Sequence, residues 1–441
     1  MNKLYYACLI CIFITCNLSC KKNIENEIGV IWSDNVEFAW YCELFNASQQ
    51  KWKFVVEYKK NIIDELLTSH DEPDIIVCSF LNVHATQGRF RKLDHLIAKM
   101  GKHFFYDELL ELGKTDGTQY LLPVSFNLPT IIFSINNTHL LQNPFTLSFD
   151  DLKKLSPSFN TKSRGLYTRM GFAPRWEDEV LYLAMQGMGV NFEETIFSPS
   201  HTATSSPKIT ESENKEYTFQ WDEDRLEKTI SYLKNWTAST NENSEQEEDF
   251  KFKYLYNVPY LLIENSLCAF YYMPTDRLFS IEPDKMRNLD FRYLEVNGKI
   301  PCKDDVLYIA IPNICQNVKA SEAFLQWFYS SETQEELLIK KMESSLLAKK
   351  FGIAGGFSAS KQVTCEVFPK YYPLLLSHLL PNDSLKVPSI LPKNWSMLKE
   401  KILIPYLQEA SRVRSKEENS FHQMNSLTQR VNEWMEKRII R

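Results

Sequence analysis

The stretch from residue 115 to residue 140 constrains the fold most strongly, because it reads as one extended segment with two apolar parts. The Asp116-Gly117 pair is a turn signal. It is followed by an apolar run at 120–123, a polar patch at Ser125–Asn127 and a β-rich run at Thr130–Ile135. A polar interruption between two apolar runs favours a strand that leaves one hydrophobic core and enters another. We therefore expect two cores, connected near Ser125–Asn127.

Strands and helices alternate over the residues that precede this stretch. Short apolar or alternating runs predict strands, and the runs between them predict helices, the first of which follows a capping sequence at Ser33–Asn35. This β-α-β-α-β order predicts a mostly parallel sheet with helices on both faces, in which ligands bind beyond the carboxyl ends of the strands. The loops Trp32–Asn35 and Ser79–Asn82 therefore become candidate ligand loops. The expected strands are Ile28–Trp32, Trp52–Tyr58 and Ile75–Ser79, and the expected helices are Val36–Gln49, Ile62–Ser69 and Leu93–Lys99.

The N-terminus has the pattern of a secretory signal. Leu4–Thr15 is a mostly apolar run of signal-peptide length, shorter than the roughly 20 residues that a membrane-spanning helix needs. The run leads to Ser19-Cys20, and a small residue before a cysteine is typical of a lipoprotein signal, in which the cysteine carries the lipid anchor. We expect residues 1–19 to be the signal peptide and residues 20–27 to be a lipidated N-terminus and linker. Cleavage elsewhere, with Cys16 as a second candidate, and an uncleaved anchor are the alternatives.

Composition and motifs exclude several classes of function. The net charge of −6 gives no argument for nucleic-acid binding. The cysteines beyond the signal are scattered without a CxxC or Cys/His cluster, so no zinc site is expected, and a Cys302–Cys315 disulfide is left open. No serine-hydrolase, zinc-peptidase, P-loop or dinucleotide motif occurs. The acidic pairs Asp150-Asp151 and Asp304-Asp305 are interpreted as solvated helix starts and turns. We therefore expect no enzyme, metal or cofactor.

Several segments resemble, in their order along the chain, motifs of the bacterial family 1 extracellular solute-binding proteins. These are the maltose-binding-protein-like substrate-binding lipoproteins of ABC transporters. The resemblance extends from Ile28 to about Arg438, and each motif by itself is weak. The segments that carry it are 115–140, Leu147–Leu152, a helix at 319–337 with a matching Gln334, and Gly352–Ser358, which lacks the family's proline.

The resemblance implies an α/β periplasmic-binding-protein fold. It would have two lobes, each a mixed, mostly parallel sheet flanked by helices, with three hinge crossings between them. Ser125–Asn127 would be a hinge segment beside the ligand cleft. Two polar, acidic stretches at about 198–217 and 238–250 are expected to be flexible insertions. The expected first lobe comprises residues 28–126 and 300–342, and the second lobe comprises residues 127–299 and 343–441.

Candidate ligand contacts are aromatic and polar residues at the predicted strand ends and crossings. Aromatic rings can cover the apolar faces of a sugar, while carboxylate, amide and guanidinium groups pair with its hydroxyl groups. For Trp32 the alternative is core packing, and for Trp176 it is stacking on Arg175. Of two neighbouring strand tyrosines, one faces the core and the other can face the cleft. The candidates are Trp32, Asp34, Asn35, Ser79, Asn82, Asn127, Arg175, Trp176, Tyr271, Tyr272, Phe357 and Ser358.

Together these patterns predict a monomeric extracytoplasmic protein, periplasmic or at the cell surface, that an N-terminal lipid anchors to a membrane. The resemblance implies that it delivers a sugar or similar polar solute to the permease subunits of an ABC importer and closes around the solute by a hinge motion. One alternative is a lipoprotein with the same fold that has lost transport and acts as a sensor or protein-interaction module. The missing proline after Gly356 and the acidic insertions favour that alternative. A secreted hydrolase is a third, less supported possibility.

Overall fold

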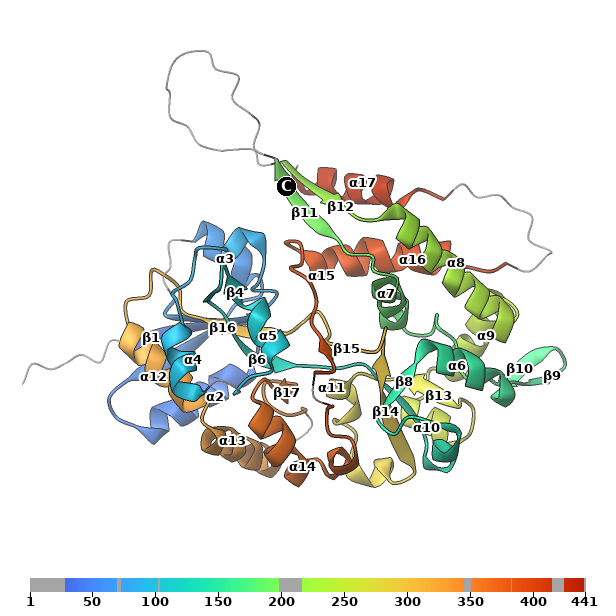
Figure 1. Cartoon of the computed structure of the whole chain (residues 1–441), viewed down its shortest axis with the longest axis horizontal. Coiled ribbons are helices and arrows are strands. Elements are labelled where there is room, and N and C mark those ends of the chain that lie inside the picture. Colours follow the sequence, from blue (N-terminus) through green and yellow to red (C-terminus); the bar gives the residue numbers. More distant parts are fainter. Residues whose placement is uncertain are drawn as a thin grey trace, which may run out of the picture.

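The computed structural model describes residues 28–69, 73–101, 104–197, 216–344, 350–381, 383–414 and 424–439. These residues form two lobes, each with its own β-sheet and flanking helices, so the expected two-lobed α/β architecture is confirmed (Figure 1). The predicted signal peptide, the predicted lipidation residue Cys20 and most of the first predicted insertion lie outside the described residues. Within the described ranges, no helix is both long and apolar enough to traverse a bilayer.

The first lobe is built on a six-stranded sheet that the N-terminal part of the chain begins. Its strand order is β17 (Phe357–Ser358), β6 (Leu122–Phe126), β16 (Leu307–Ala310), β3 (Ile75–Ser79), β1 (Ile28–Ser33) and β2 (Lys53–Tyr58). The predicted early strands and helices are confirmed to within a few residues, because their apolar positions are the ones that the core buries. The helices of this lobe include α2 (Glu37–Ser48), α3 (Ile62–Thr68), α4 (Asp94–Met100), α5 (Asp107–Leu112) and α14 (Phe368–Tyr371).

The second lobe is built on a four-stranded sheet. Its strand order is β13 (Phe270–Tyr272), β7 (Thr130–Ser134), β14 (Leu289–Glu295) and β8 (Thr146–Ser148). Helices pack around a separate cluster of buried residues that includes Phe133, Trp236 and Trp395. These helices are α6 (Phe149–Leu155), α7 (Asp178–Gly187), α8 (Glu223–Thr240), α15 (Trp395–Leu398), α16 (Ile404–Ala410) and α17 (Leu427–Ile439).

Both sheets are mixed, but they are less parallel than predicted. The parallel pairs are β1–β2, β1–β3 and β14–β8, whereas the other pairs of the two sheets are antiparallel. The βαβ pattern of the N-terminal part governs only its own strands. β16, which returns to the first sheet after a crossing, pairs antiparallel with the earlier strand β3.

The chain crosses between the lobes at the place that the sequence indicates. β6 ends at Phe126 in the first sheet, and β7 begins at Thr130 in the second. Two later crossings run side by side, because β15 (Ile300–Pro301) pairs in parallel with β18 (Leu385–Lys386) between the lobes (Figure 1). The hinge region is therefore one extended segment beside a small two-stranded ladder.

Three local predictions are wrong. The sequence places all of 343–441 in the second lobe, but β17 pairs with β6 and the side chains around it, within 351–372, enter the first core. A two-residue strand carries too little pattern to be predicted. The helix expected at 319–337 is two helices, α12 (Val318–Phe328) and α13 (Ser331–Glu343), because Ser330 caps the second. The stretch 238–250 is not a loop, because it contains the start of α9 (Ser244–Tyr254), with Asn243 as its cap.

The remaining strands form small peripheral ladders. β11 (Glu193–Phe197) and β12 (Glu216–Gln220) pair on either side of the undescribed part of the first predicted insertion. Cys302 and Cys315 are separate, buried free thiols, which settles the disulfide left open by the sequence. The other short elements are β4 (Lys114–Thr115), β5 (Thr118–Gln119), β9 (Thr161–Ser163), β10 (Leu166–Arg169), α10 (Pro259–Glu264) and α11 (Thr275–Leu278).

Candidate functional site

Three adjoining cavities lie between the lobes. The strand-end cavity, of about 510 Å³, is lined by Asp34, Asn35, Val36, Glu37, Ser79, Ser125, Asn127, Asp276, Ser280, Asp305, Leu307, Lys350, Phe351, Ala354 and Gly355. The aromatic cavity, of about 530 Å³, is lined by Trp176, Glu177, Asp178, Glu179, Lys251, Leu255, Tyr271, Tyr272, Pro274, Asp276, Arg277 and Lys303. The lysine cavity, of about 400 Å³, is lined by Phe80, Asp178, Glu179, Lys303, Asp304, Asp305, Trp395, Ser396, Lys399, Glu400 and Ile404. Each pair of cavities shares a lining residue: Asp276 lines the strand-end and aromatic cavities, Asp305 the strand-end and lysine cavities, and Lys303 the aromatic and lysine cavities. The three cavities therefore form one cleft.

The carboxyl ends of two parallel strands supply the polar floor of the strand-end cavity. Asp34 follows β1, and its carboxylate accepts a hydrogen bond from the backbone N–H of Ser79 at the end of β3, at 3.4 Å. Parallel strands bring such ends to one edge of the sheet, so the two predicted ligand loops meet there. Burial raises the pKa of Asp34 to about 6, and the nearby negative charge of Asp305 adds to the effect.

A buried ion pair fixes the loop that forms another side of this cavity. Lys341 and Glu37 are each 1% exposed, and their charged groups are 2.8 Å apart. The Lys341 ammonium also donates to the carbonyl oxygen of Gly352, at 2.6 Å. Gly352 has a positive φ of 55°, and a Cβ there would lie 2.0 Å from the Gly356 carbonyl oxygen, so the turn requires glycine. Burial lowers the pKa of Lys341, and Glu37 opposes that effect.

Asparagine side chains connect this loop to both lobes. Asn35 donates to the carbonyl oxygen of Ala354 at 2.8 Å, and Asn127 donates to that of Gly355 at 3.0 Å. The amide oxygen of Asn127 accepts a hydrogen bond from the hydroxyl of Thr275 at 2.9 Å. Since Asn127 lies on the first crossing and Thr275 begins α11, this residue couples the strand-end cavity to the second lobe.

Stacked rings form one wall of the aromatic cavity. Trp176 stacks on Tyr271 with ring centroids 6.3 Å apart and on Phe250 with centroids 5.4 Å apart. The hydroxyl of Tyr271 donates to the carboxylate of Glu177 at 2.6 Å, which fixes both groups at the cavity. The two neighbouring tyrosines alternate as expected, because Tyr272 packs in the buried cluster of the second lobe and Tyr271 does not, although Tyr272 also contributes to the lining of the cavity.

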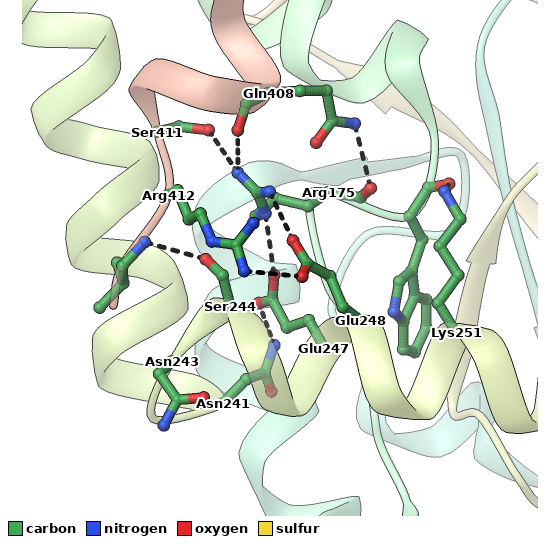
Figure 2. A network of polar contacts seen from close by, with 12 residues as sticks. Arg175, Asn241, Asn243, Ser244, Glu247, Glu248, Lys251, Gln408, Ser411 and Arg412 are labelled. Atoms are coloured by element: carbon green, nitrogen blue, oxygen red, sulfur yellow. Dashed lines mark hydrogen bonds and ion pairs between the residues drawn. The ribbon is translucent and has the colours of Figure 1, made fainter. Parts of the chain in front are cut away.

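Arg175, directly before Trp176, is a buried anchor rather than a lining residue. Its guanidinium donates to the Gln408 carbonyl and to the Ser411 hydroxyl on one side, and it pairs with Glu247 and Glu248 of α9 on the other (Figure 2). Burial raises the pKa of Glu247 to about 7, although Asn241 and Arg175 oppose that effect.

The Arg175 network holds the backbone of the cleft loop from two sides. Lys251 donates to the Trp176 carbonyl oxygen at 2.9 Å, and Gln408 donates to the Arg175 carbonyl oxygen at 3.3 Å (Figure 2). Gln408 also donates to the Asp178 carboxylate, at 3.0 Å. The loop therefore carries its aromatic side chain into the cleft while its backbone is fixed to α9 and α16.

Lysines bridge the carboxylates between the cavities. Lys399 lies 2.9 Å from Glu179 and 3.3 Å from Asp304, and Lys303 lies 3.4 Å from Asp305. Burial disfavours the charged form of Lys303, but the surrounding carboxylates outweigh it and raise its pKa. Within the described ranges, no group of His, Cys, Asp or Glu side chains is arranged to hold a metal ion.

Seven of the twelve predicted site residues line the cleft. They are Asp34, Asn35, Ser79, Asn127, Trp176, Tyr271 and Tyr272. The other five are absent from the lining of the three cavities, because their side chains pack in the core or form polar contacts with other residues of the protein. Trp32 and Phe357 pack in the first core, Asn82 donates to the Leu112 carbonyl, Ser358 donates to Gln334, and Arg175 lies in its ion-pair network.

The sequence reasoning missed the charged residues that connect the cavities. Asp304 is not a solvated turn residue: it is 7% exposed and accepts a hydrogen bond from the Trp395 indole at 2.7 Å. Asp151 does cap a helix, because it forms a capping box with Ser148 at the start of α6. The run of three charged residues at 303–305, next to the second crossing, is the sequence signal that could have indicated these charged residues.

Comparison with known proteins agrees with this architecture. No protein-family model matches the chain, and no curated protein matches it by sequence. An ABC substrate-binding protein from Listeria monocytogenes in complex with cycloalternan shares 13% identity over 87% of this chain and 93% of that one, with a TM-score of 0.53. The cyclic α-maltosyl-1,6-maltose binding protein of Arthrobacter globiformis shares 14% identity over 87% of this chain and 93% of that one, with a TM-score of 0.54.

A third solved structure covers more of the chain. The maltose/maltodextrin-binding domain of Bdellovibrio bacteriovorus, bound to maltotriose, shares 12% identity over 93% of this chain and 99% of that one, with a TM-score of 0.50. At these identities the likeness concerns the fold. The chain has the two-lobed α/β substrate-binding fold that the resemblance of its sequence motifs implied.

Proposed function

We propose that this protein is the extracytoplasmic solute-binding subunit of an ABC importer and that its solute is a carbohydrate. The observation that carries the proposal is the cleft, in which a stacked aromatic wall adjoins cavities lined by carboxylates and amides. Aromatic faces suit the apolar faces of sugar rings, and the polar groups suit hydroxyls. The similar solved structures include complexes with cycloalternan and with maltotriose, which supports a saccharide ligand.

The cleft is open enough for a ligand to enter. Cavities of about 530 and 510 Å³ fall within the size range of small-molecule sites. A cleft filled by large side chains would instead favour a lipoprotein that has lost transport. Hinge closure around the bound sugar would draw on the crossing at Asn127 and on the β15–β18 ladder.

Binding is tested by calorimetric titration of the mature chain with a panel of oligosaccharides that differ in linkage and length. A single-site isotherm with a Kd in the micromolar range, about −8 kcal/mol, is expected for at least one oligosaccharide. The Trp176→Leu variant should lose most of that affinity while keeping a cooperative melt. Absence of binding by every saccharide would contradict the carbohydrate assignment.

We also propose that Cys20 carries a lipid that holds the protein at a membrane surface, where permease subunits bind the closed form. The Cys20→Ala variant should appear in the soluble extracytoplasmic fraction, whereas the unaltered chain should partition with membranes. A Cys16→Ala variant is the matched control, and it should partition as the unaltered chain does. Equal membrane association of the Cys20→Ala variant would contradict the anchor.

A further inference from the structure

The strand-end cavity has a negative charge that the protein leaves uncompensated. Glu37 is neutralised from behind by Lys341, at 2.8 Å. Asp276 and Asp305 share a single cation, because Lys303 lies 3.7 and 3.4 Å from them. Lys350 is the only cationic residue among the described residues that line this cavity, whereas four acidic residues line it: Asp34, Glu37, Asp276 and Asp305.

Asp34 is the carboxylate without a cation. It forms no ion pair with any described residue, and its hydrogen bond from the Ser79 backbone is long, at 3.4 Å. It lies at the carboxyl end of β1, where the parallel strands of the sheet open into the cleft. Burial of a carboxylate without a partner is unfavourable, and a cation brought by a ligand would remove that cost.

Unpartnered atoms in the same cavity are also acceptors. Glu37 is 1% exposed, lines the cavity, and its Oε1 has no hydrogen-bond partner among the described residues. Asp276 lines the cavity as well, and its Oδ1 is buried without a partner. A buried polar atom without a partner costs free energy that a ligand can recover. Both atoms are carboxylate oxygens, so the ligand must supply hydrogen-bond donors.

The neutral side chains of the cavity do not reverse this bias. The amide groups of Asn35 and Asn127 donate to the backbone carbonyls of Ala354 and Gly355, and their oxygens accept from the Glu37 backbone and from Thr275. The Ser79 hydroxyl donates to the carbonyl oxygen of Asp305, at 3.4 Å. These contacts consume much of the donor capacity of the cavity, whereas the unpartnered carboxylate oxygens of Glu37 and Asp276 keep their capacity to accept hydrogen bonds.

We infer that the strand-end cavity receives a protonated amine, with Asp34 as its counter-ion, and that the solute is an amino sugar or an oligomer of one. The inference rests on the proposed carbohydrate-binding function, because the aromatic cavity next to it provides the stacking surface for sugar rings. The two cavities share Asp276, so one ligand can extend a sugar ring over the aromatic wall and an amine toward Asp34.

The test compares ligands that differ in charge but not in backbone. Calorimetric titrations use the β-1,4-linked tetramer of glucosamine, its fully N-acetylated form and the tetramer of glucose, with maltotetraose and spermidine as further ligands. The glucosamine tetramer should bind at least tenfold more tightly than each neutral tetramer, and higher salt should reduce the difference because charge attraction is screened. The Asp34→Asn variant should lose the preference while keeping any affinity for neutral tetramers.

Each outcome supports or overturns a separate part of the inference. A neutral tetramer that binds as tightly as the glucosamine tetramer overturns the amine site and leaves the carbohydrate function standing. Binding of spermidine with no binding of any saccharide overturns the carbohydrate function and keeps the cation site. No binding by any of these ligands overturns both. The Glu335→Gln variant, which removes a surface carboxylate paired with Lys370, is the matched control and should leave every affinity unchanged.

Discussion

The two walls of the cleft are held in place by different physical means. The strand-end wall stands on the edge of a β-sheet, and its positions follow from backbone pairing and from one ion pair between Lys341 and Glu37. In the aromatic wall, Trp176 stands on a loop before α7, and the position of this loop follows from side-chain contacts to α9 and α16, centred on Arg175 (Figure 2). The strand-end wall is fixed by backbone pairing together with one ion pair, whereas the Trp176 loop is fixed by side-chain contacts alone.

This difference has a consequence for what a substitution does. A residue at a strand end of this wall, such as Asp34, can be changed without moving its neighbours, because the sheet continues to define the backbone. A residue that holds the aromatic wall can move the ring of Trp176 without touching a ligand. Loss of stability and loss of affinity should therefore be separable at the strand-end wall and coupled at the aromatic wall.

The largest effect is expected from the Lys341→Met variant. Removal of one partner of a buried ion pair leaves an uncompensated charge, and such changes cost about 3 to 5 kcal/mol. The free energy of unfolding, measured in urea, should fall by that amount. The double variant Glu37→Gln with Lys341→Met should recover much of the loss, since neither charge is then buried alone. A single variant that costs under about 1 kcal/mol would show that the pair does not hold the loop.

The Arg175→Met variant should cost about 3 kcal/mol at pH 8 and less at pH 6. Without the guanidinium, the folded-state pKa of Glu247 lies still further above its unfolded value than the present value of about 7. For a carboxyl group with a raised pKa, stability is present at low pH and is lost as the pH rises through the folded-state pKa. Urea unfolding at the two pH values measures the difference.

The control for Arg175 is the Glu248→Gln variant, because Glu248 is 44% exposed and its pairing is weakened by water. It should cost under about 1 kcal/mol at both pH values. Arg175→Met should also lower carbohydrate affinity together with stability, since the Trp176 ring loses its anchor. Affinity that stays unchanged in this variant would contradict the coupling proposed for the aromatic wall.

Local sequence patterns predicted the strand-end wall well. The strands that end at Ser33 and Ser79 and the crossing after Phe126 are short-range features, and apolar alternation and polar interruption report them directly. The rule that ligands bind at carboxyl ends of parallel strands then selected Asp34 and Asn35 without any coordinates. Within this wall, prediction failed where an element was too short to carry a pattern, as at β17.

The aromatic wall could not be predicted in the same way. Whether Arg175 faces a ligand or a buried carboxylate depends on Glu247, 72 positions away by residue number, in a stretch whose polar composition indicated a loop. Polar composition indicated an exposed loop, but Glu247 is only 1% exposed because it pairs with Arg175 inside the fold. Lys399 and Asp304 were missed for the same reason, since their partners meet only after the chain has crossed between the lobes three times.

A smaller effect is expected at Asp34, and it has the opposite sign. The pKa of this carboxyl rises from an ordinary value of 3.8 to about 6 on folding, so the folded protein binds more protons between these values and loses stability as the pH rises through them. Asp34→Asn removes that loss, and at pH 7 the variant should be more stable than the unaltered protein by about 1 to 2 kcal/mol. Thermal unfolding of both proteins at pH 4 and at pH 7 measures the difference in stability at low and at neutral pH. A variant that is less stable at pH 7 would show that the charged carboxylate has a partner in the free protein.

The smallest effect separates two adjacent tyrosines of the aromatic cavity. Tyr271→Phe removes the hydrogen bond to Glu177 and should cost about 1 kcal/mol of stability. Tyr272→Phe removes a buried hydroxyl that has no partner among the described residues, so it should be neutral or slightly stabilising. Urea unfolding of both variants measures the contrast.

Carbohydrate titrations of the same two variants then show which hydroxyl a ligand uses. If Tyr272→Phe binds more weakly while its stability is unchanged, the unpartnered hydroxyl of Tyr272 is the one that contacts the ligand. Equal losses of stability in the two variants would contradict the assignment of the hydrogen bond to Tyr271 alone.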